Sequence, residues 1–147
     1  IESAPTAEET IFGPSEYEVM RTNSIAKKNR AIQTKLEKVI SYTKQTMVAY
    51  MSEEELNRLC AYIVEYSSGD TLQKISPVKV DSQLKSIDIM HFGWNIGKAF
   101  GRKRIHTATF VKNVFAHALR DLEISTIERK MSHTEAKCQI NLNTKIL

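Results

Sequence analysis

The chain has 147 residues, of which 41% are hydrophobic and 26% are charged, and its formal net charge is +4. A chain of this size buries a core of its own without the help of a metal ion or disulfides. Its longest apolar runs are too short to cross a membrane, so the composition excludes a membrane-spanning protein and is typical of a globular one.

The amino-terminal residues 1–14 are polar and show no signal-peptide pattern of charged, apolar and small residues. We expect them to form a disordered tail, and residues 15–147 to form a single helical domain. Cys60 and Cys138 are the two cysteines. Cys60 lies on the apolar side of a predicted helix, where a thiol acts as a small hydrophobe. The pair predicts a reduced, cytoplasmic protein and no disulfide framework.

A long helix is predicted from Glu16 to about Met51. Ser15 followed by Glu18 forms a capping box, in which the serine oxygen accepts a hydrogen bond from the N–H three residues further on. Apolar side chains then recur with helical spacing at Ile25, Ile32, Leu36, Val39, Met47 and Tyr50. This stripe predicts an amphipathic helix that faces the core. Because its period is close to 3.5 residues, a short coiled-coil seam is the alternative.

The second helix is predicted over residues 53–67. Ser52 and Glu55 form another capping box. Apolar residues follow at i, i+3, i+4, i+7 and i+8, namely Leu56, Leu59, Cys60, Ile63 and Val64. Gly69 ends this helix, and residues 69–80 form a linker that is the candidate subdomain boundary.

Three more helices are predicted in the carboxy-terminal half. They cover about 82–100, 107–122 and 126–132, and Ser125 with Glu128 forms a capping box at the last of them. Residues 138–147 alternate between apolar and polar side chains, which suits a short strand or a docked tail. The chain is therefore predicted to be all-α, an orthogonal bundle of about five helices.

Gly93, Gly97 and Gly101 lie four residues apart in the stretch HFGWNIGKAFG. They do not match a phosphate-binding loop, which needs four residues between its glycines and a hydroxyl after its lysine. Glycines at this spacing share one side of a helix and allow close packing, which offsets their cost of roughly 1 kcal/mol each in helix propensity. We expect Gly101 to end the helix in a left-handed conformation, and Trp94 to anchor the core.

No pattern of catalytic or metal-ligating residues occurs in the sequence. The histidines at 91, 106, 117 and 133 do not have the spacing of metal ligands, and no nucleophile motif is present. We therefore expect a protein that is not an enzyme and that has no metal and no cofactor. His91 shares a helix side with apolar residues, so it is predicted to be hydrogen-bonded and half-buried.

The carboxy-terminal half is basic. Residues 72–147 carry 13 Lys and Arg against 6 Asp and Glu, whereas residues 1–71 carry 8 against 11. Such a surplus of cations suits a phosphate-backbone partner. A helix-turn-helix needs a supporting helix, a short turn and a second helix with a free polar side. The segment from Gly101 to Leu122 offers the turn and the second helix, so we hypothesise a DNA-binding or regulatory protein.

The residues expected at the nucleic acid are polar side chains of this basic half. Arg102, Lys103 and Arg104 are assigned to phosphates, and Thr109, Lys112, Asn113, Arg120, Arg129 and Lys130 to base edges or the backbone. In a second arrangement the helix 110–122 supports and the helix 126–132 lies at the nucleic acid. The alternative function is a protein-interaction adaptor or homodimer that forms through the long amino-terminal helix.

The stretches PVKVDSQLKSIDIMHFGWNIGKAFG and LEISTIERKM carry a resemblance. They resemble small, uncharacterised bacterial proteins with an HFGWN-like helix and a carboxy-terminal ST-I-x-R segment, similar to a helix-turn-helix and loosely associated with mobile genetic elements. The resemblance covers about residues 53–131 and implies a bacterial origin. It implies no activity, cofactor or catalytic residue.

Overall fold

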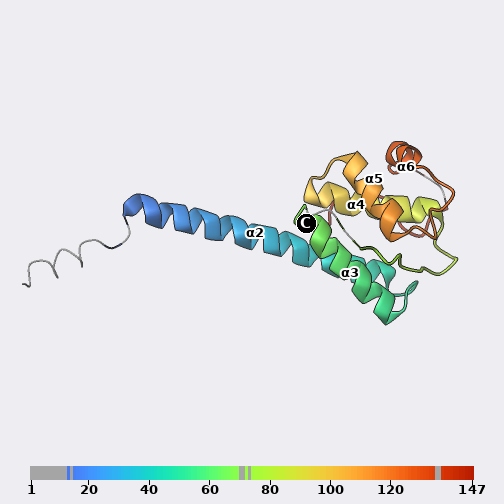
Figure 1. Cartoon of the computed structure of the whole chain (residues 1–147), viewed down its shortest axis with the longest axis horizontal. Helices are drawn as coiled ribbons and strands as arrows, with labels where there is room; N and C mark the ends of the chain where they lie inside the picture. The colour runs from blue at the N-terminus through green and yellow to red at the C-terminus, as the bar shows by residue number, and fades with distance from the viewer. Residues whose placement is uncertain (1–12, 14, 70–71, 73, 135–136) are drawn as a thin grey trace, which may run out of the picture. The chain divides into compact units, whose positions relative to one another are not determined.

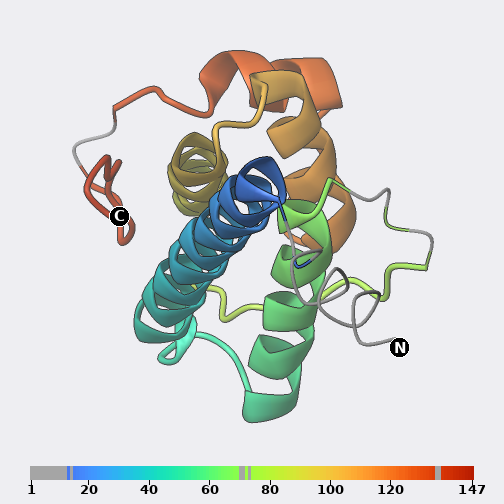
Figure 2. The ribbon, with the colours of Figure 1, turned by 90° about the vertical axis from the view of Figure 1, so that its left-hand side faces the viewer.

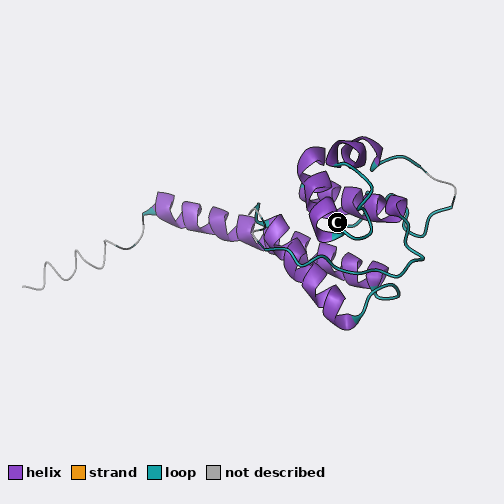
Figure 3. Cartoon of the chain, turned by 45° about the vertical axis from the view of Figure 1, so that its right-hand side comes forward, coloured by secondary structure: helices purple, strands orange, loops and turns teal. Residues whose placement is uncertain are grey.

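The computed structural model describes residues 13, 15–69, 72, 74–134 and 137–147. Within these residues the chain has five helices and no strand (Figures 1 and 3): α2 (Glu16–Met47), α3 (Glu53–Ser67), α4 (Ser86–Phe100), α5 (Arg104–Val114) and α6 (Ile124–Lys130). The predicted all-α class is confirmed. The predicted tail 1–14 lies outside the described residues, apart from Gly13. Among the described helices, none combines the length and the apolar character that a membrane span requires.

The chain divides into two compact units, Ile1–Thr34 and Lys35–Leu147. In the described part of the first unit, every residue is exposed except Ala26, which is half-buried. The second unit contains the rest of α2 and the other four helices, and every buried apolar side chain among the described residues belongs to it. The linker at 69–80 falls inside this second unit.

Two of the three predicted capping boxes begin a helix. Ser15 Oγ accepts the Glu18 N–H at 3.1 Å, and Ser52 Oγ accepts the Glu55 N–H at 3.2 Å. The box predicted at Ser125 is wrong, because α6 begins two residues earlier, after Glu123, without a side-chain cap. Ser125 therefore lies within the first turn.

The observed bounds of α4 and α5 differ from the predicted ones, one because of a local cap and the other beside a contact from a distant segment. α4 begins at Ser86 rather than Ser82, since the Asp88 carboxylate accepts the Lys85 N–H at 2.9 Å and caps the helix there. α5 ends at Val114 rather than Leu122, and its last carbonyl accepts the N–H of Val78 at 2.8 Å. Residues 115–121 form turns instead. They still bury the two apolar side chains Phe115 and Leu119.

The glycines of α4 allow α5 to pack closely, as predicted. A Cβ atom on Gly93 would lie 2.5 Å from Cγ1 of Val111, and one on Gly97 would overlap the side chain of Thr107. Gly101 has φ +69° and ψ +31°, the left-handed conformation that ends α4. The glycine spacing is thus explained by the packing of α4 against α5.

Aromatic contacts join the helices of the second unit. The ring of Phe92 on α4 stacks on Tyr42 of α2 at 5.9 Å between centroids, and it meets Phe115 edge-on at 6.1 Å. Tyr66 of α3 stacks on Phe110 of α5 at 4.3 Å. α5 also lies beside both α4 and α6 (Figure 2), so it is the central helix of this unit.

The carboxy-terminal residues 137–147 are a docked tail, and the alternative of a short strand is wrong. Three polar side chains on one side of α4 hold this tail. Asp88 accepts the N–H groups of Gln139 and Ile140 at 2.6 and 3.1 Å. Asn95 accepts the Asn143 N–H at 2.7 Å.

The third of these side chains is His91, whose ring nitrogens lie 2.8 Å from the Ile140 carbonyl oxygen and 2.5 Å from that of His133. The prediction that His91 is hydrogen-bonded is confirmed. It is buried rather than half-buried, with 1% of its surface exposed, because the tail covers it.

Candidate nucleic-acid interface

A turn of three residues, Gly101 to Lys103, joins α4 to α5. It is shorter than the connection between the predicted helices 82–100 and 107–122, because α5 begins at Arg104 rather than Thr107. Left-handed Gly101 reverses the chain, the Arg102 N–H bonds to the Gly97 carbonyl at 2.9 Å, and Lys103 is extended as the residue before α5. The basic triplet at 102–104 thus spans this turn and the first residue of α5.

Arg102 binds the carboxy-terminal end of α3. Its Nη2 donates to the carbonyl oxygens of Tyr66 and Ser67 at 3.0 and 2.8 Å, and its guanidinium carbon lies 5.6 Å from the centre of the Tyr66 ring. A cation at this end of a helix satisfies terminal carbonyls and complements the helix dipole. Arg102 therefore has a structural role in joining α3 to the turn.

Arg104 binds the carboxy-terminal end of α6 in the same manner. Its Nη2 donates to the Glu128 carbonyl at 2.5 Å, and its Nη1 donates to the Ser132 hydroxyl at 3.0 Å. Lys112 also acts within the fold, since its Nζ donates to the Leu119 carbonyl at 2.7 Å. Three of the cations assigned to nucleic acid thus stabilise helix ends and turns.

The other predicted site residues lie at or near the surface. Lys103, Arg129 and Lys130 are exposed, and within the described residues they form no side-chain hydrogen bond or ion pair. Arg120 is exposed and donates to the His117 carbonyl at 3.0 Å. Thr109 is half-buried, and its hydroxyl donates to the Ile105 carbonyl at 2.8 Å.

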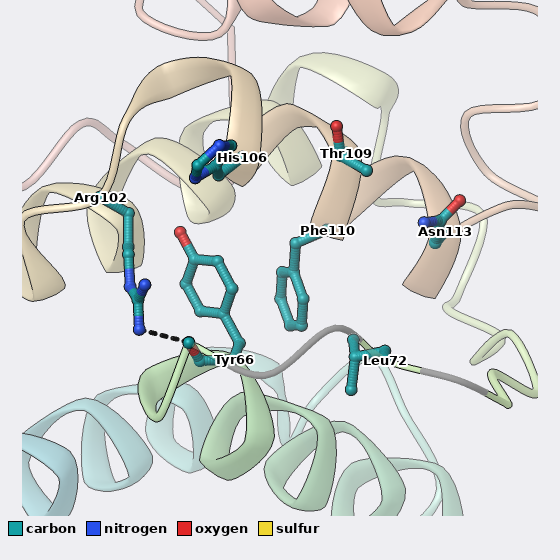
Figure 4. Close-up of a pocket in the computed structure, with 8 residues that line it drawn as sticks. Tyr66, Leu72, Arg102, His106, Thr109, Phe110 and Asn113 are labelled. Carbon is teal, nitrogen blue, oxygen red and sulfur yellow. Dashed lines mark hydrogen bonds between the residues drawn. The ribbon is translucent and has the colours of Figure 1, made fainter.

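A cavity of about 260 Å³, which we call the aromatic cavity, lies between the end of α3 and α5. Its lining residues are Tyr66, Gly69, Leu72, Arg102, His106, Thr109, Phe110 and Asn113. Figure 4 shows the stacked rings of Tyr66 and Phe110 between Arg102 and Leu72. Asn113, like Arg102 and Thr109, was assigned to nucleic acid from the sequence. This cavity brings these three predicted residues together.

Tyr66 is a buried residue that lines the aromatic cavity. Its hydroxyl lies 2.7 Å from the Thr107 hydroxyl, and burial raises the pKa of this phenol above its ordinary value. The hydrogen bond to Thr107 and the charge of Arg102 oppose that rise. Tyr66 is therefore a neutral hydrogen-bonding group at physiological pH.

A second cavity, the cationic cavity, has a volume of about 170 Å³ and shares Arg102 with the aromatic cavity. It is lined by Trp94, Gly97, Lys98, Arg102, Arg104, Thr107 and Met131. Lys98 Nζ lies 6.0 Å from the centre of the Trp94 ring. Trp94, predicted to anchor the core, packs against it but is half-buried, and so also borders this cavity.

Two basic side chains that line these cavities, Lys98 and His106, were not predicted as site residues from the sequence. Lys98 follows Trp94 by four residues on α4, so their side chains share one side of that helix. His106 precedes Thr109 and Asn113 by three and seven residues, the spacing of one side of α5. Helical spacing was therefore enough to predict both residues, whereas the prediction was based on the charged triplet 102–104.

Comparison of the chain with protein-family models, with curated proteins and with solved structures finds no match. Within the described residues, no group of three or more His, Cys, Asp and Glu side chains is arranged to hold a metal ion. The function must therefore be argued from the arrangement of these side chains alone.

Proposed function

We propose that the chain binds nucleic acid through α4, the Gly101–Lys103 turn and α5, which together act as a helix-turn-helix. The observation that carries this proposal is the turn itself. Two helices joined by three residues, with a glycine first, match the spacing of this motif. In such a motif the second helix, here α5, lies in the major groove.

The accessible side of α5 offers groups that can bind bases. His106 and Asn113 are exposed, and Thr109 is half-buried on the same side of the helix. Asn pairs with adenine through two hydrogen bonds, and Thr bonds to several bases or contacts the thymine methyl group. Of the two arrangements, the one with α4 and α5 fits the motif better. The other needs α5 and α6 as its helix pair, and a connection of nine residues separates them, whereas the motif has a short turn.

The phosphate contacts are assigned to the exposed cations around this unit. Lys103 precedes α5, and Arg129 and Lys130 form the last turn of α6, to which Arg104 is bound. These three side chains are free to reach phosphates, whereas Arg102 and Lys112 are engaged within the fold. Long-range attraction by such cations accounts for most non-specific affinity.

A mobility-shift assay with duplex and single-stranded DNA tests this proposal. A triple Lys103→Ser, Arg129→Ser and Lys130→Ser variant should lose most of its affinity at low salt and remain folded. The matched control replaces three exposed lysines elsewhere in the second unit, Lys74→Ser, Lys79→Ser and Lys145→Ser, which removes the same charge. Wild-type affinity should fall steeply as salt rises. The absence of any retardation at low salt, or equal loss in both triple variants, contradicts the proposal.

A second candidate function is homodimerisation through α2. Ile25 and Ile32 belong to the predicted seam and are 42% and 61% exposed, while Val39 of the same stripe is fully buried. Exposed apolar side chains in register along a helix are typical of a protein interface. The non-enzymatic, cytoplasmic character of the protein, like this dimer, stays a prediction.

A further inference from the structure

We propose that the cationic cavity is a binding site for a phosphate group, and that under the proposed function this group is a phosphodiester of the nucleic-acid backbone. The site lies between α4, the turn and the first residues of α5. Three cations from these consecutive elements border it: Lys98, Arg102 and Arg104.

No negative charge balances these cations. Among the described residues that line the cavity there is no carboxylate, and within the described part no hydrogen bond or ion pair joins Lys98, Arg102 or Arg104 to one. The carbonyl groups that hold the two arginines carry only partial charges. Three like charges around one small space repel one another, and an anion in that space would relieve the repulsion.

The arginines keep donors that can face an anion. Among the described contacts, Arg102 donates through Nη2 and Arg104 through Nη1 and Nη2, and Nη1 of Arg102 lies beside Gly69. The Nε groups of the two arginines have no acceptor among these contacts. Since the guanidinium groups are already positioned by helix ends, they lose little freedom when they bind. Arginine at a fixed position is the side chain best suited to the oxygens of phosphate.

The surroundings of the cations also favour an anion. Arg104 and Thr107 belong to the first turn of α5, whose positive dipole end has no side-chain cap. Gly97 keeps the wall of the cavity free of a side chain. The volume of about 170 Å³ is several times the ~30 Å³ that a water molecule occupies in the liquid, so a tetrahedral oxyanion has room.

Trp94 borders the cavity and is the one tryptophan of the chain, so its fluorescence reports directly on occupancy. The experiment titrates the full chain with inorganic phosphate, and with sodium chloride at equal ionic strength. We expect a saturable change in Trp94 emission with phosphate alone. Lys98→Gln should raise the required phosphate concentration by about tenfold, since it removes one charge-assisted contact.

The matched control is Lys79→Gln, which removes an exposed lysine that does not line the cavity and is not assigned to nucleic acid. It should leave the phosphate titration close to that of the wild type. No saturable change beyond the chloride control, or an equal effect of both variants, overturns the proposed site.

A short oligothymidylate, titrated in the same way, separates this site from the proposed function. Binding that shifts Trp94 emission and weakens in Lys98→Gln supports both proposals. Binding of the oligonucleotide, or of duplex DNA in the mobility-shift assay, without a response of Trp94 overturns the site and leaves the function standing. A response to phosphate alone, with no binding of either nucleic acid, supports a site for free phosphate or a phosphorylated small molecule and contradicts the function.

Discussion

The carboxy-terminal tail 137–147 and the first part of α2, residues 16–34, contrast both in regular secondary structure and in burial. The tail has no regular secondary structure, yet Ile140 within it is 4% exposed and its N–H is bonded to Asp88. Residues 16–34 form a regular helix, yet nearly all of them are exposed. Regular secondary structure and burial in a core are therefore separate properties of this chain.

The difference follows from where backbone groups find their hydrogen bonds. A helix satisfies its own N–H and C=O groups at every turn, so residues 16–34 need no other segment for this purpose. The tail has no such ladder, and its buried backbone groups require partners elsewhere. Asp88, His91 and Asn95 of α4 supply them.

The largest expected effect is that of Asp88→Ala, which removes the anchor of the tail. The carboxylate is 1% exposed and accepts three N–H groups, from Lys85, Gln139 and Ile140. Its loss leaves buried donors without a partner, so the free energy of unfolding should fall by about 2–4 kcal/mol. Urea denaturation measures this change.

Asp81→Ala is the control for Asp88→Ala. Asp81 is exposed and accepts the Gln83 N–H at 2.9 Å, so its replacement should cost well under half as much. Equal losses in the two variants would show that the tail contributes little to stability.

The second prediction concerns alkaline pH and Tyr42 of α2, whose hydroxyl oxygen accepts a hydrogen bond from Asn95 Nδ2 at 2.7 Å. Since Asn95 also binds the carboxy-terminal tail, Tyr42 links α2 to the contacts that hold the tail. Burial raises the pKa of Tyr42 above 10, and hydrogen bonds with Asn95 and Thr46 oppose the rise. Because the folded-state pKa is the higher one, its stabilising contribution is complete below pH 10 and is lost as pH rises through the folded pKa.

Melting temperatures between pH 9 and pH 11 test this prediction. The wild type should lose more stability over this range than Tyr42→Phe, which has no group to ionise at that position. Tyr17→Phe, at a side chain that is 67% exposed, should keep the pH dependence of the wild type. Identical pH profiles for all three proteins would contradict the assignment to Tyr42.

The smallest expected effect is that of Ile25→Ser together with Ile32→Ser on α2. Both side chains are largely exposed, so the free energy of unfolding of the monomer should change by no more than about 0.5 kcal/mol per site. Met47→Ala, on the same helix but fully buried, should cost about 2–5 kcal/mol.

Light scattering on the same double variant tests the homodimer. A mass that rises with concentration in the wild type and not in the variant supports it, whereas a constant monomer mass in the wild type contradicts it. Val39 of the same stripe is unsuitable for this test, because its side chain is fully buried and its replacement would disrupt the core.

Much of the fold was predictable because its signals are local. The capping serines at 15 and 52, the glycine at 101 and the apolar stripe of α3 act on residues within one or two turns. The start of α4 and both ends of α5 were mispredicted. The bond from Val78 to the end of α5 crosses more than thirty residues of sequence, which no local pattern records.

For the candidate site, the sequence predicted only which residue types it contains and not what they contact. The sequence indicates a basic turn, and the structure shows that its members have different surroundings. Arg102 and Arg104 bind the ends of α3 and α6, while Lys103 is exposed. Side chains adjacent in the sequence diverge at a turn, so their partners depend on which helix ends lie nearby.

By itself, the sequence determined that this chain is helical, where two of its helices begin and where glycines permit close packing, because these properties arise from hydrogen bonds and spacing within a few residues. Only the tertiary structure decided which cations are bound to helix ends and which are free, and that a tail without regular structure belongs to the core. Those outcomes depend on charges, carbonyl groups and amides that come together from distant parts of the chain.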